Sequence, residues 1–325
     1  MSLVRLLAQR IALGAVAVWS LLTIVFALFT MTRDWALETR IALAAFGGGM
    51  DAAQLDRIRE EYLAARGLDR PIHEQYFDWM GNMLTLQWGH SFQNYEPVFP
   101  AVMAATVETA TYVVPAIVVA TGAGLVIGVY TALYRDSIHA GAVRSGSYVG
   151  LGLPHFWIGL MILALAGISP GFRRLSTTLR PTEMPFFYGT VVPASLIAVA
   201  LTAAIVSYAR AYSLQYASTD VTKLVRAKGG GTLDVARHVV RNAAIPLVSL
   251  VFTETFALLA LSVFVIEALF GIDGLGLLIY NAVWSRDLPM LLGAAMVVVV
   301  AGVASNVLQD LAYSTLDPRV DTGTR

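Results

Sequence analysis

Residues 288–311 read LPMLLGAAMVVVVAGVASNVLQDL, an apolar run whose first charged side chain is Asp310. An α-helix needs about 20 mostly apolar residues to cross the hydrocarbon core of a bilayer, which is roughly 30 Å thick. This stretch has that length and composition. It therefore predicts a membrane-spanning helix and gives a criterion for the rest of the chain.

Five other segments meet the same criterion, at residues 11–31, 106–134, 148–168, 189–209 and 245–270. The composition agrees, because 57% of the 325 residues are hydrophobic, only 14% are charged and the mean hydropathy is +0.67. We therefore predict an all-α membrane protein with six transmembrane helices. The first segment is longer than the apolar core of a secretory signal and no small-residue cleavage pattern follows it, so we expect it to stay attached.

Several chemistries are excluded by what the sequence lacks. It has no cysteine, which rules out disulfides, thiol nucleophiles and thiolate metal sites. Basic and acidic residues balance at 22 each, so net charge gives no argument for binding nucleic acid. We predict no metal site, because the histidines lack the close pairing that one needs: His73, His90, His139, His155 and His238.

The basic residues are distributed unevenly between the two ends of the predicted spans. Positive side chains near helix ends resist translocation, so they mark the cytoplasmic side. One side collects Arg5, Arg10, Arg135, Arg144, Arg210, Lys223, Arg226, Lys228, Arg237, Arg241, Arg319 and Arg325. The short loops opposite hold only Arg173, Arg174, Arg180 and Arg286. We therefore predict that both termini are cytoplasmic.

The first long connection, residues 32–100, is then extracytoplasmic, and its pattern predicts helices. Asp51 is placed to cap a helix that Gly67 stops. The apolar face of that helix carries Leu55, Ile58 and Tyr62. A second piece is rich in aromatic residues and methionine, and we favour packing at the membrane interface over a ligand site for Tyr76, Phe77, Trp79, Met80 and Met83.

The second long connection is basic, and residues 213–246 read SLQYASTDVTKLVRAKGGGTLDVARHVVRNAAIP. Glycine costs about 1 kcal/mol per helical position relative to alanine, so the glycines at 229–231 should break the helix. We expect a protruding helical elbow whose second helix is capped by Thr232, has Asp234 in its first turn and ends at Pro246. In that short helix Arg237, His238 and Arg241 fall toward the negative end. A basic loop held near anionic lipid is the alternative, and these residues alone leave both interpretations open.

This connection resembles the cytoplasmic loop of ABC-importer permeases, in the branch that includes dipeptide, oligopeptide and nickel permeases. The resemblance rests on Asp220, Arg226-Ala227-Lys228-Gly229, Arg237-His238, Arg241-Asn242-Ala243 and Pro246. It continues through most of the chain, in Arg66-Gly67-Leu68-Asp69-Arg70-Pro71, Gln75-Tyr76, Pro97-Val98, Thr106, Glu108, Pro154, Phe156, Glu267, Phe270, Gly274-Leu275-Gly276, Arg286-Asp287, Pro289, Asn306, Asp310, Tyr313 and Asp317-Pro318-Arg319.

The chain departs from the family pattern at three places. Residues 32–35 read TRDW where the family usually has a Pro-Gly-Asp-Pro element. The usual Gly-Asp-Leu-Gly-x-Ser is reduced to Gly89 and Ser91, and Val221 stands where an aromatic residue is usual. These departures lie mostly outside, so they bear on the docking partner and the substrate rather than on coupling.

The resemblance implies that the elbow is a coupling helix seated on an ATPase subunit, with Asp220, Arg226, Ala227, Lys228, Gly229 and Gly230 as the coupling residues. The chain itself cannot hydrolyse ATP, because its only lysines, Lys223 and Lys228, end no phosphate-binding loop. It is therefore not an enzyme and carries no cofactor. ATP and Mg belong to two partner ATPases.

The other implied partners are a second homologous permease, an extracytoplasmic substrate-binding protein and membrane lipid. A heterodimer of permeases is expected, and a homodimer stays open. The resemblance implies peptides as the substrate, with nickel or another small solute as the alternative. The chain then divides into a first helix at residues 1–31, an extracytoplasmic region at 32–100 and a five-helix permease domain at 101–325 with the coupling loop at 210–244.

Carboxylates within apolar segments usually face protein or water. Glu254 lies deep in the segment 245–270, where it either lines the pathway or bonds to a neighbouring helix. Glu108 and Glu267 are expected to hold structure. Pro115, Gly122, Gly124 and Gly128 have a packing explanation, since small residues let helices approach closely.

Two other classes of protein fit a multispanning chain. A secondary transporter or channel for a small solute would need ion-coupling sites at unwound helices in the middle of the membrane and no ATPase. A membrane-embedded enzyme would need a convergent set of reactive side chains, which Glu254 alone does not supply.

Overall fold

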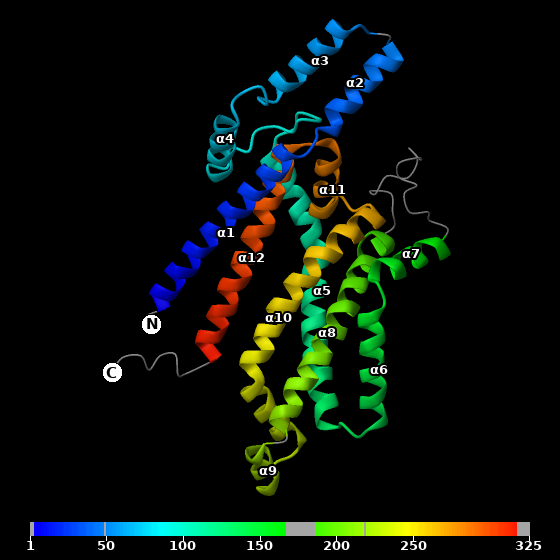
Figure 1. The fold of residues 1–325 in the computed structure, drawn as a ribbon. Coiled ribbons are helices and arrows are strands. Elements are labelled where there is room, and N and C mark those ends of the chain that lie inside the picture. Colours follow the sequence, from blue (N-terminus) through cyan, green and yellow to red (C-terminus); the bar gives the residue numbers. More distant parts are fainter. Residues whose placement is uncertain (1–2, 49, 167–185, 218, 317–325) are drawn as a thin grey trace. The chain divides into compact units, whose positions relative to one another are not determined.

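The computed structural model describes residues 3–48, 50–166, 186–217 and 219–316 (Figure 1). All regular elements in these ranges are helices, and one isolated bridge joins His90 to Pro97. Among the described residues, four helical stretches are long and apolar enough to cross a membrane unaided, and two bent helix pairs raise the number to six if each pair is one span. The predicted all-α membrane fold is confirmed.

The chain forms two compact units. The first unit comprises Met1–Arg10, Glu108–Asp273 and Gly302–Arg325, and the second comprises Ile11–Val107 and Gly274–Ala301. Three long helices have residues in both units, namely α1 (Leu3–Met31), α5 (Val98–Leu133) and α12 (Leu288–Leu316).

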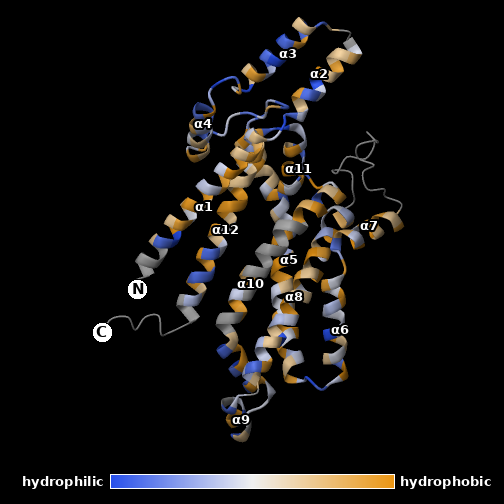
Figure 2. Ribbon diagram, in the orientation of Figure 1, coloured by the Kyte–Doolittle hydropathy of each residue, from blue (hydrophilic) through white to orange (hydrophobic). Residues whose placement is uncertain are grey.

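In the first unit, α8 (Val192–Ala217) packs along α10 (Thr232–Phe270) and α6 (Ile138–Gly152). Figure 2 shows that α5 and α8 are hydrophobic along much of their length. A helix that is apolar all round is normally buried, which accounts for the many buried residues of α8. The core of this unit includes Tyr112, Leu163, Leu196, Leu201, Ile266 and Phe270.

Two glycines let α5 approach α8 closely. A Cβ atom at Gly124 would lie 2.7 Å from the Ile205 side chain, and one at Gly128 would lie 2.6 Å from the Ala209 Cβ. The packing explanation is confirmed for these two positions. It finds no support at Gly122, where a Cβ atom would meet no atom of the described residues within 4 Å.

The segment expected as one helix at 148–168 is bent, so the expectation of one continuous helix there is wrong. α6 and α7 (His155–Leu165) meet at an angle of 85°. Proline disfavours the helical conformation in the residue before it, and Leu153, which precedes Pro154, is extended. Residues 167–168 of the expected span lie outside the described ranges.

A second sharp bend follows α10. Gly271 ends the helix with φ 69°, and α11 (Leu275–Ser285) leaves at 83° to the last turns of α10. The sequence analysis did not anticipate α11.

In the second unit, α3 (Ala52–Ala65) has the boundaries that its sequence predicts. The Asp51 carboxylate accepts a 2.8 Å hydrogen bond from the backbone amide of Gln54. The backbone amide of Asp51 donates a 3.0 Å hydrogen bond to the side-chain oxygen of Gln54. Gly67 follows with φ 62°. Tyr62 is the buried residue of this helix. The preceding helix α2 (Trp35–Gly48) was not expected.

The aromatic and methionine cluster lies on α4 (Ile72–Leu84), and most of it packs on protein. Met80 and Met83 belong to the buried core of the second unit, and Tyr76 and Trp79 pack against that core. Phe77 is exposed. Packing against this core of the protein therefore accounts for four of the five residues, and the expected packing at the membrane interface stays a prediction. The same core includes Leu22, Phe26, Trp88, Val98, Leu288 and Leu292.

Candidate functional site

The candidate site is the connection between α8 and α10, which we call the elbow (residues 219–231). It contains a short helix, α9 (Asp220–Ala227), followed by the glycine run. Figure 1 shows α9 beyond the adjoining ends of α8 and α10. The helical elbow expected from the sequence is present.

Two threonines fasten the start of α9 to the end of α8. The Tyr216 carbonyl accepts hydrogen bonds from the hydroxyls of Thr219 at 2.8 Å and Thr222 at 2.9 Å. Carbonyls in the last turn of a helix lack a partner within that helix, and these hydroxyls satisfy one of them. The buried Thr222 was missed by the sequence analysis, although a Thr-x-x-Thr pattern just after a helix is a local signal for such a bond.

The glycine run has a different requirement at each position. Gly229 adopts φ 83°, a left-handed conformation that favours glycine. The Gly230 amide donates a 3.0 Å hydrogen bond to the Val225 carbonyl, and a Cβ atom there would lie 2.8 Å from both that oxygen and the Val225 Cγ1. Gly231 has φ −74°, and a Cβ atom there would lie 3.8 Å from Asp234 Oδ2, an ordinary van der Waals contact. The sharp reversal therefore depends on Gly229 and Gly230.

The cap of α10 differs from the expected one. Gly231 is the N-cap residue and Thr232 is the first residue of the helix, so the prediction that Thr232 caps it is wrong. The Asp234 carboxylate accepts a 2.9 Å hydrogen bond from the Gly231 amide. Asp234 lies in the positive first turn, as predicted, and its side chain ties the turn to the helix.

The expected end of the second elbow helix at Pro246 is also wrong. α10 continues through that position to Phe270 as one helix. Proline is tolerated within membrane helices because surrounding groups can satisfy the freed backbone. Arg237, His238 and Arg241 consequently lie in the first three turns of α10 rather than near its negative end.

The exposed surface of the elbow carries charges. Lys223 Nζ lies 2.8 Å from Asp220 Oδ1, with 71% and 94% of the two side chains exposed. The hydrogen bond from Lys223 holds the pKa of Asp220 below its usual value. An exposed pair of this kind contributes little to stability, so it is available for a partner. Ala227, Lys228 and Gly229 are exposed as well.

All six predicted coupling residues thus lie on α9 and the turn after it, and the side chains or exposed backbone of five of them are described, namely Asp220, Ala227, Lys228, Gly229 and Gly230. The sixth, Arg226, lies on α9, and its side chain is outside the described part. Glu254 is not near the elbow, because it lies 22 residues along α10 from Thr232, or about 33 Å at 1.5 Å per residue. Its side chain is also outside the described part.

The other two carboxylates have distinct surroundings. Glu267 is fully buried, and its Oε1 accepts hydrogen bonds from the hydroxyls of Thr109 at 2.6 Å and Tyr112 at 2.9 Å. These bonds join α10 to α5. Glu108 is exposed. Among the side chains that the structure describes, no group of three potential ligands is arranged to hold a metal ion.

The chain belongs to the family described as binding-protein-dependent transport system inner membrane components, whose characteristic region matches residues 124–322. This region includes α8, the elbow and α10. The resemblance to ABC-importer permeases is confirmed. The chain is therefore a multi-pass inner-membrane permease component and not an enzyme, and this family assignment favours it over the alternative of a secondary transporter or channel.

Named relatives match most of the chain. A putative peptide permease protein of Brucella ovis is 28% identical over 318 residues, covering 96% of this chain and 97% of that protein. The oligopeptide transport system permease protein AppB of Bacillus subtilis is 28% identical over 269 residues, or 81% and 85% of the two chains. The di/tripeptide transport system permease protein DppB of Pseudomonas aeruginosa is 26% identical, with 97% and 98% covered.

Proposed function

We propose that the chain forms half of the translocation path of an ATP-driven peptide importer. The names of relatives matched over 81% to 97% of this chain support peptides as the substrate. An extracytoplasmic binding protein delivers the peptide, and a second, homologous permease supplies the other half of the path. Two ATPase subunits bind ATP and Mg and drive the cycle.

The elbow is the proposed seat for an ATPase subunit. A rigid protrusion needs small residues for close approach and charges that set its orientation. Ala227 and Gly229 supply the first, and Asp220, Lys223 and Lys228 supply the second. Thr219 and Thr222 hold the elbow to α8, and the glycine turn connects it to α10. A displacement of the elbow is therefore transmitted to both helices.

The observation that carries this proposal is the continuity of α10. It begins at the elbow with Thr232 and runs unbroken for 39 residues to Phe270, about 58 Å at 1.5 Å per residue. A helix of this length delivers a displacement of the elbow directly to the membrane interior, as a rigid-body motion.

The elbow has to lie in the cytoplasm for this mechanism, with both termini on the same side. The basic residues of the elbow and of the first turns of α10 support that orientation, because positive side chains resist translocation. Membrane lipid surrounds the spans.

Glu254 is the proposed pathway residue, since α10 carries it from the elbow into the membrane. A carboxylate at that depth needs water or a polar partner. Replacement by glutamine keeps the shape and removes the charge. Unchanged peptide uptake and ATPase activity in Glu254→Gln would remove this residue from the pathway.

The coupling role is tested in proteoliposomes that hold the assembled complex. Lys228→Glu reverses an exposed charge in the elbow, and Gly229→Asp adds a charge where the backbone is left-handed. Both variants should insert and assemble, but uptake per ATP hydrolysed should fall at least about tenfold, because the elbow no longer seats correctly.

Arg135→Glu is the matched control. Arg135 is an exposed cation in another short connection of the first unit, where it pairs with Asp136 at 3.4 Å. It should leave uptake per ATP unchanged. Wild-type uptake in Lys228→Glu and Gly229→Asp would refute the coupling role of the elbow.

A further inference from the structure

Arg286, at the turn between α11 and α12, is almost completely buried with a backbone conformation that is rare for its residue type. Its φ is 55°, and 4% of its surface is exposed. A non-glycine residue in the left-handed region is uncommon and persists where its surroundings fix it. Its amide donates to carbonyls of the last turn of α11 and so ends that helix.

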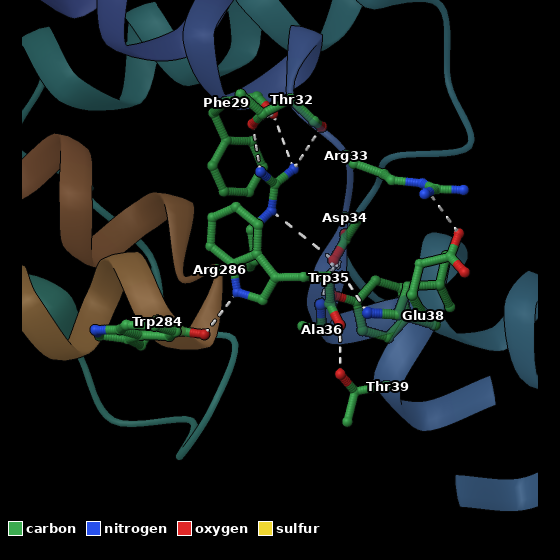
Figure 3. A network of polar contacts seen from close by, with 12 residues as sticks. Phe29, Thr32, Arg33, Asp34, Trp35, Ala36, Glu38, Thr39, Trp284 and Arg286 are labelled. Carbon is green, nitrogen blue, oxygen red and sulfur yellow. Dashed lines mark hydrogen bonds and ion pairs between the residues drawn. The ribbon is translucent and has the colours of Figure 1, made fainter. Parts of the chain in front are cut away.

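The guanidinium group of Arg286 closes the end of α1 (Figure 3). Nη2 donates at 2.8 Å to the Phe29 carbonyl and at 3.3 Å to the Thr32 carbonyl, and Nη1 donates at 2.5 Å to the Thr32 hydroxyl. The last carbonyls of a helix lack partners and carry partial negative charge, so a cation is favoured there. The guanidinium also lies over the rings of Phe29 and Trp35, at 4.1 and 4.7 Å.

Asp34 joins the same arginine to α2 and α3. Its Oδ1 lies 3.8 Å from Arg286 Nε and accepts hydrogen bonds from the amides of Ala36 and Leu37, both at 3.1 Å, which caps α2. The Tyr62 hydroxyl of α3 donates to the same carboxylate at 3.1 and 3.2 Å. Arg286 and the partly exposed Asp34 thus connect the end of α1, the start of α2 and the last turn of α3.

Trp35 makes a second link to the same turn. Its indole Nε1 donates a 2.9 Å hydrogen bond to the Trp284 carbonyl, two residues before Arg286. Its neighbour Arg33 is different, since 87% of that side chain is exposed and its ion pair with Glu38 spans 3.9 Å. The base of α2 is therefore held at two points, by Asp34 and Trp35, and Arg33 takes no part.

We propose that Arg286 is a positioning residue for transport: it sets the direction in which α2 leaves α1 and holds the hairpin of α2 and α3 in one orientation to the α11–α12 turn throughout the cycle. The Arg286 guanidinium is buried, and the Asp34 carboxylate 3.8 Å from its Nε is its nearby counter-charge, so displacing the hairpin would leave a buried cation without that counter-charge. The claim that the hairpin keeps this orientation throughout the transport cycle rests on the proposed ATP-driven function.

The orientation of the hairpin can be measured directly, because the chain has no cysteine of its own. Spin labels at Phe46→Cys and Val283→Cys report on α2 and α11. Phe46 is 93% exposed and lies eleven residues after Trp35. The two labels should therefore be roughly 20 Å apart, at 1.5 Å per residue along α2. Pulsed electron–electron double resonance measures the distribution of distances between the two labels in the assembled complex.

We expect a single narrow distribution for the labelled parent and for Arg33→Gln, unchanged when ATP and Mg are added. Arg286→Gln should broaden it, and Arg286→Lys, which keeps the charge but loses the planar fork, should give an intermediate width. A parent-like distribution in Arg286→Gln would overturn the positioning role. A parent distance that shifts with ATP would overturn the fixed orientation.

Uptake per ATP hydrolysed is a second measurement, and a lower amount of folded protein does not by itself change this ratio. In Arg286→Gln, uptake per ATP hydrolysed should fall by roughly tenfold, while the elbow still supports ATP hydrolysis. If the glutamine variant does not insert, Arg286→Lys is used instead, and its uptake per ATP hydrolysed should also fall. Arg33→Gln should match the parent. Unchanged uptake per ATP in both Arg286 variants would overturn the proposal.

Absence of ATP-dependent uptake in the parent would instead refute the proposed function. In that case the distance distributions measured without nucleotide would still decide whether Arg286 positions α2.

Discussion

Gly230 lies directly against the carbonyl group of Val225, to which its amide donates a 3.0 Å hydrogen bond. A Cβ atom at position 230 would come within 2.8 Å of that oxygen, so Gly230→Ala must open the turn. We expect faster amide hydrogen exchange over residues 219–230, corresponding to a loss of about 1–3 kcal/mol of local stability.

Gly231→Ala is the control for this prediction, because position 231 has an ordinary φ and a Cβ atom there would make only an ordinary 3.8 Å contact with Asp234. Its exchange pattern should equal that of the parent. Equal exchange in Gly230→Ala and Gly231→Ala would contradict the close contact with Val225.

The approach of α5 to α8 gives a second prediction. Gly124→Ala and Gly128→Ala place a methyl group within 2.7 Å of Ile205 and Ala209, and overpacking typically costs about 1–3 kcal/mol. Both variants should melt at a lower temperature in detergent. Gly122→Ala should melt like the parent, since a Cβ atom there has free space. A lower melting temperature for Gly122→Ala alone would argue against this packing.

The buried carboxylate of Glu267 gives a third prediction, on the stability of the protein. Tyr112→Phe removes one hydrogen bond to it and should cost about 1 kcal/mol, measured by thermal unfolding. Glu267→Ala leaves the hydroxyls of Thr109 and Tyr112 without this acceptor and should cost more. The exposed Glu108 provides the comparison, and Glu108→Ala should be neutral. Equal effects of Glu108→Ala and Glu267→Ala would disprove a structural role specific to Glu267.

The hydrogen bond between Tyr62 and Asp34 predicts a pH dependence. Burial and the charge of Asp34 raise the pKa of Tyr62 from 10.0 to about 12. The folded state therefore holds the phenolic proton more tightly than the unfolded state. The stabilisation is complete below pH 10 and is lost as the pH rises from 10 through about 12. The difference in melting temperature between the parent and Tyr62→Phe should shrink from pH 8 to pH 11, and a constant difference would contradict the shift.

The proposed orientation predicts opposite accessibility for two engineered cysteines. Lys228→Cys should react with a membrane-impermeant maleimide only from the cytoplasmic side, and Phe46→Cys only from the outside. Both side chains are exposed, and the parent contributes no thiol background. Labelling of both from the same side would refute the proposed topology.

Local signals account for the helices that were predicted well. Asp51, Gln54 and Gly67 mark the ends of α3 by side-chain caps and a left-handed glycine, which need no tertiary context. The same applies to the break after α9 at Gly229. α2 was missed because no such local signal was recognised for it, although Asp34 caps it through its side chain.

Proline gave no reliable local signal. It breaks the expected span before Pro154, whereas α10 continues through Pro246. A proline within a membrane helix is tolerated where surrounding groups satisfy the freed backbone, and the linear pattern does not say where that is the case.

The sequence by itself determined the membrane class, the apolar spans and the glycine turn of the elbow, because length, hydropathy and backbone preference act over a few neighbouring residues. Only the tertiary structure decided the partners of Arg286, which lie more than 250 residues earlier in the chain at Phe29 and Thr32. The sequence marks Arg286 as a cation in a short loop and as part of the family resemblance, and neither observation names its partners. Its burial against the end of α1 is fixed by packing between distant segments, for which a single sequence carries no local pattern.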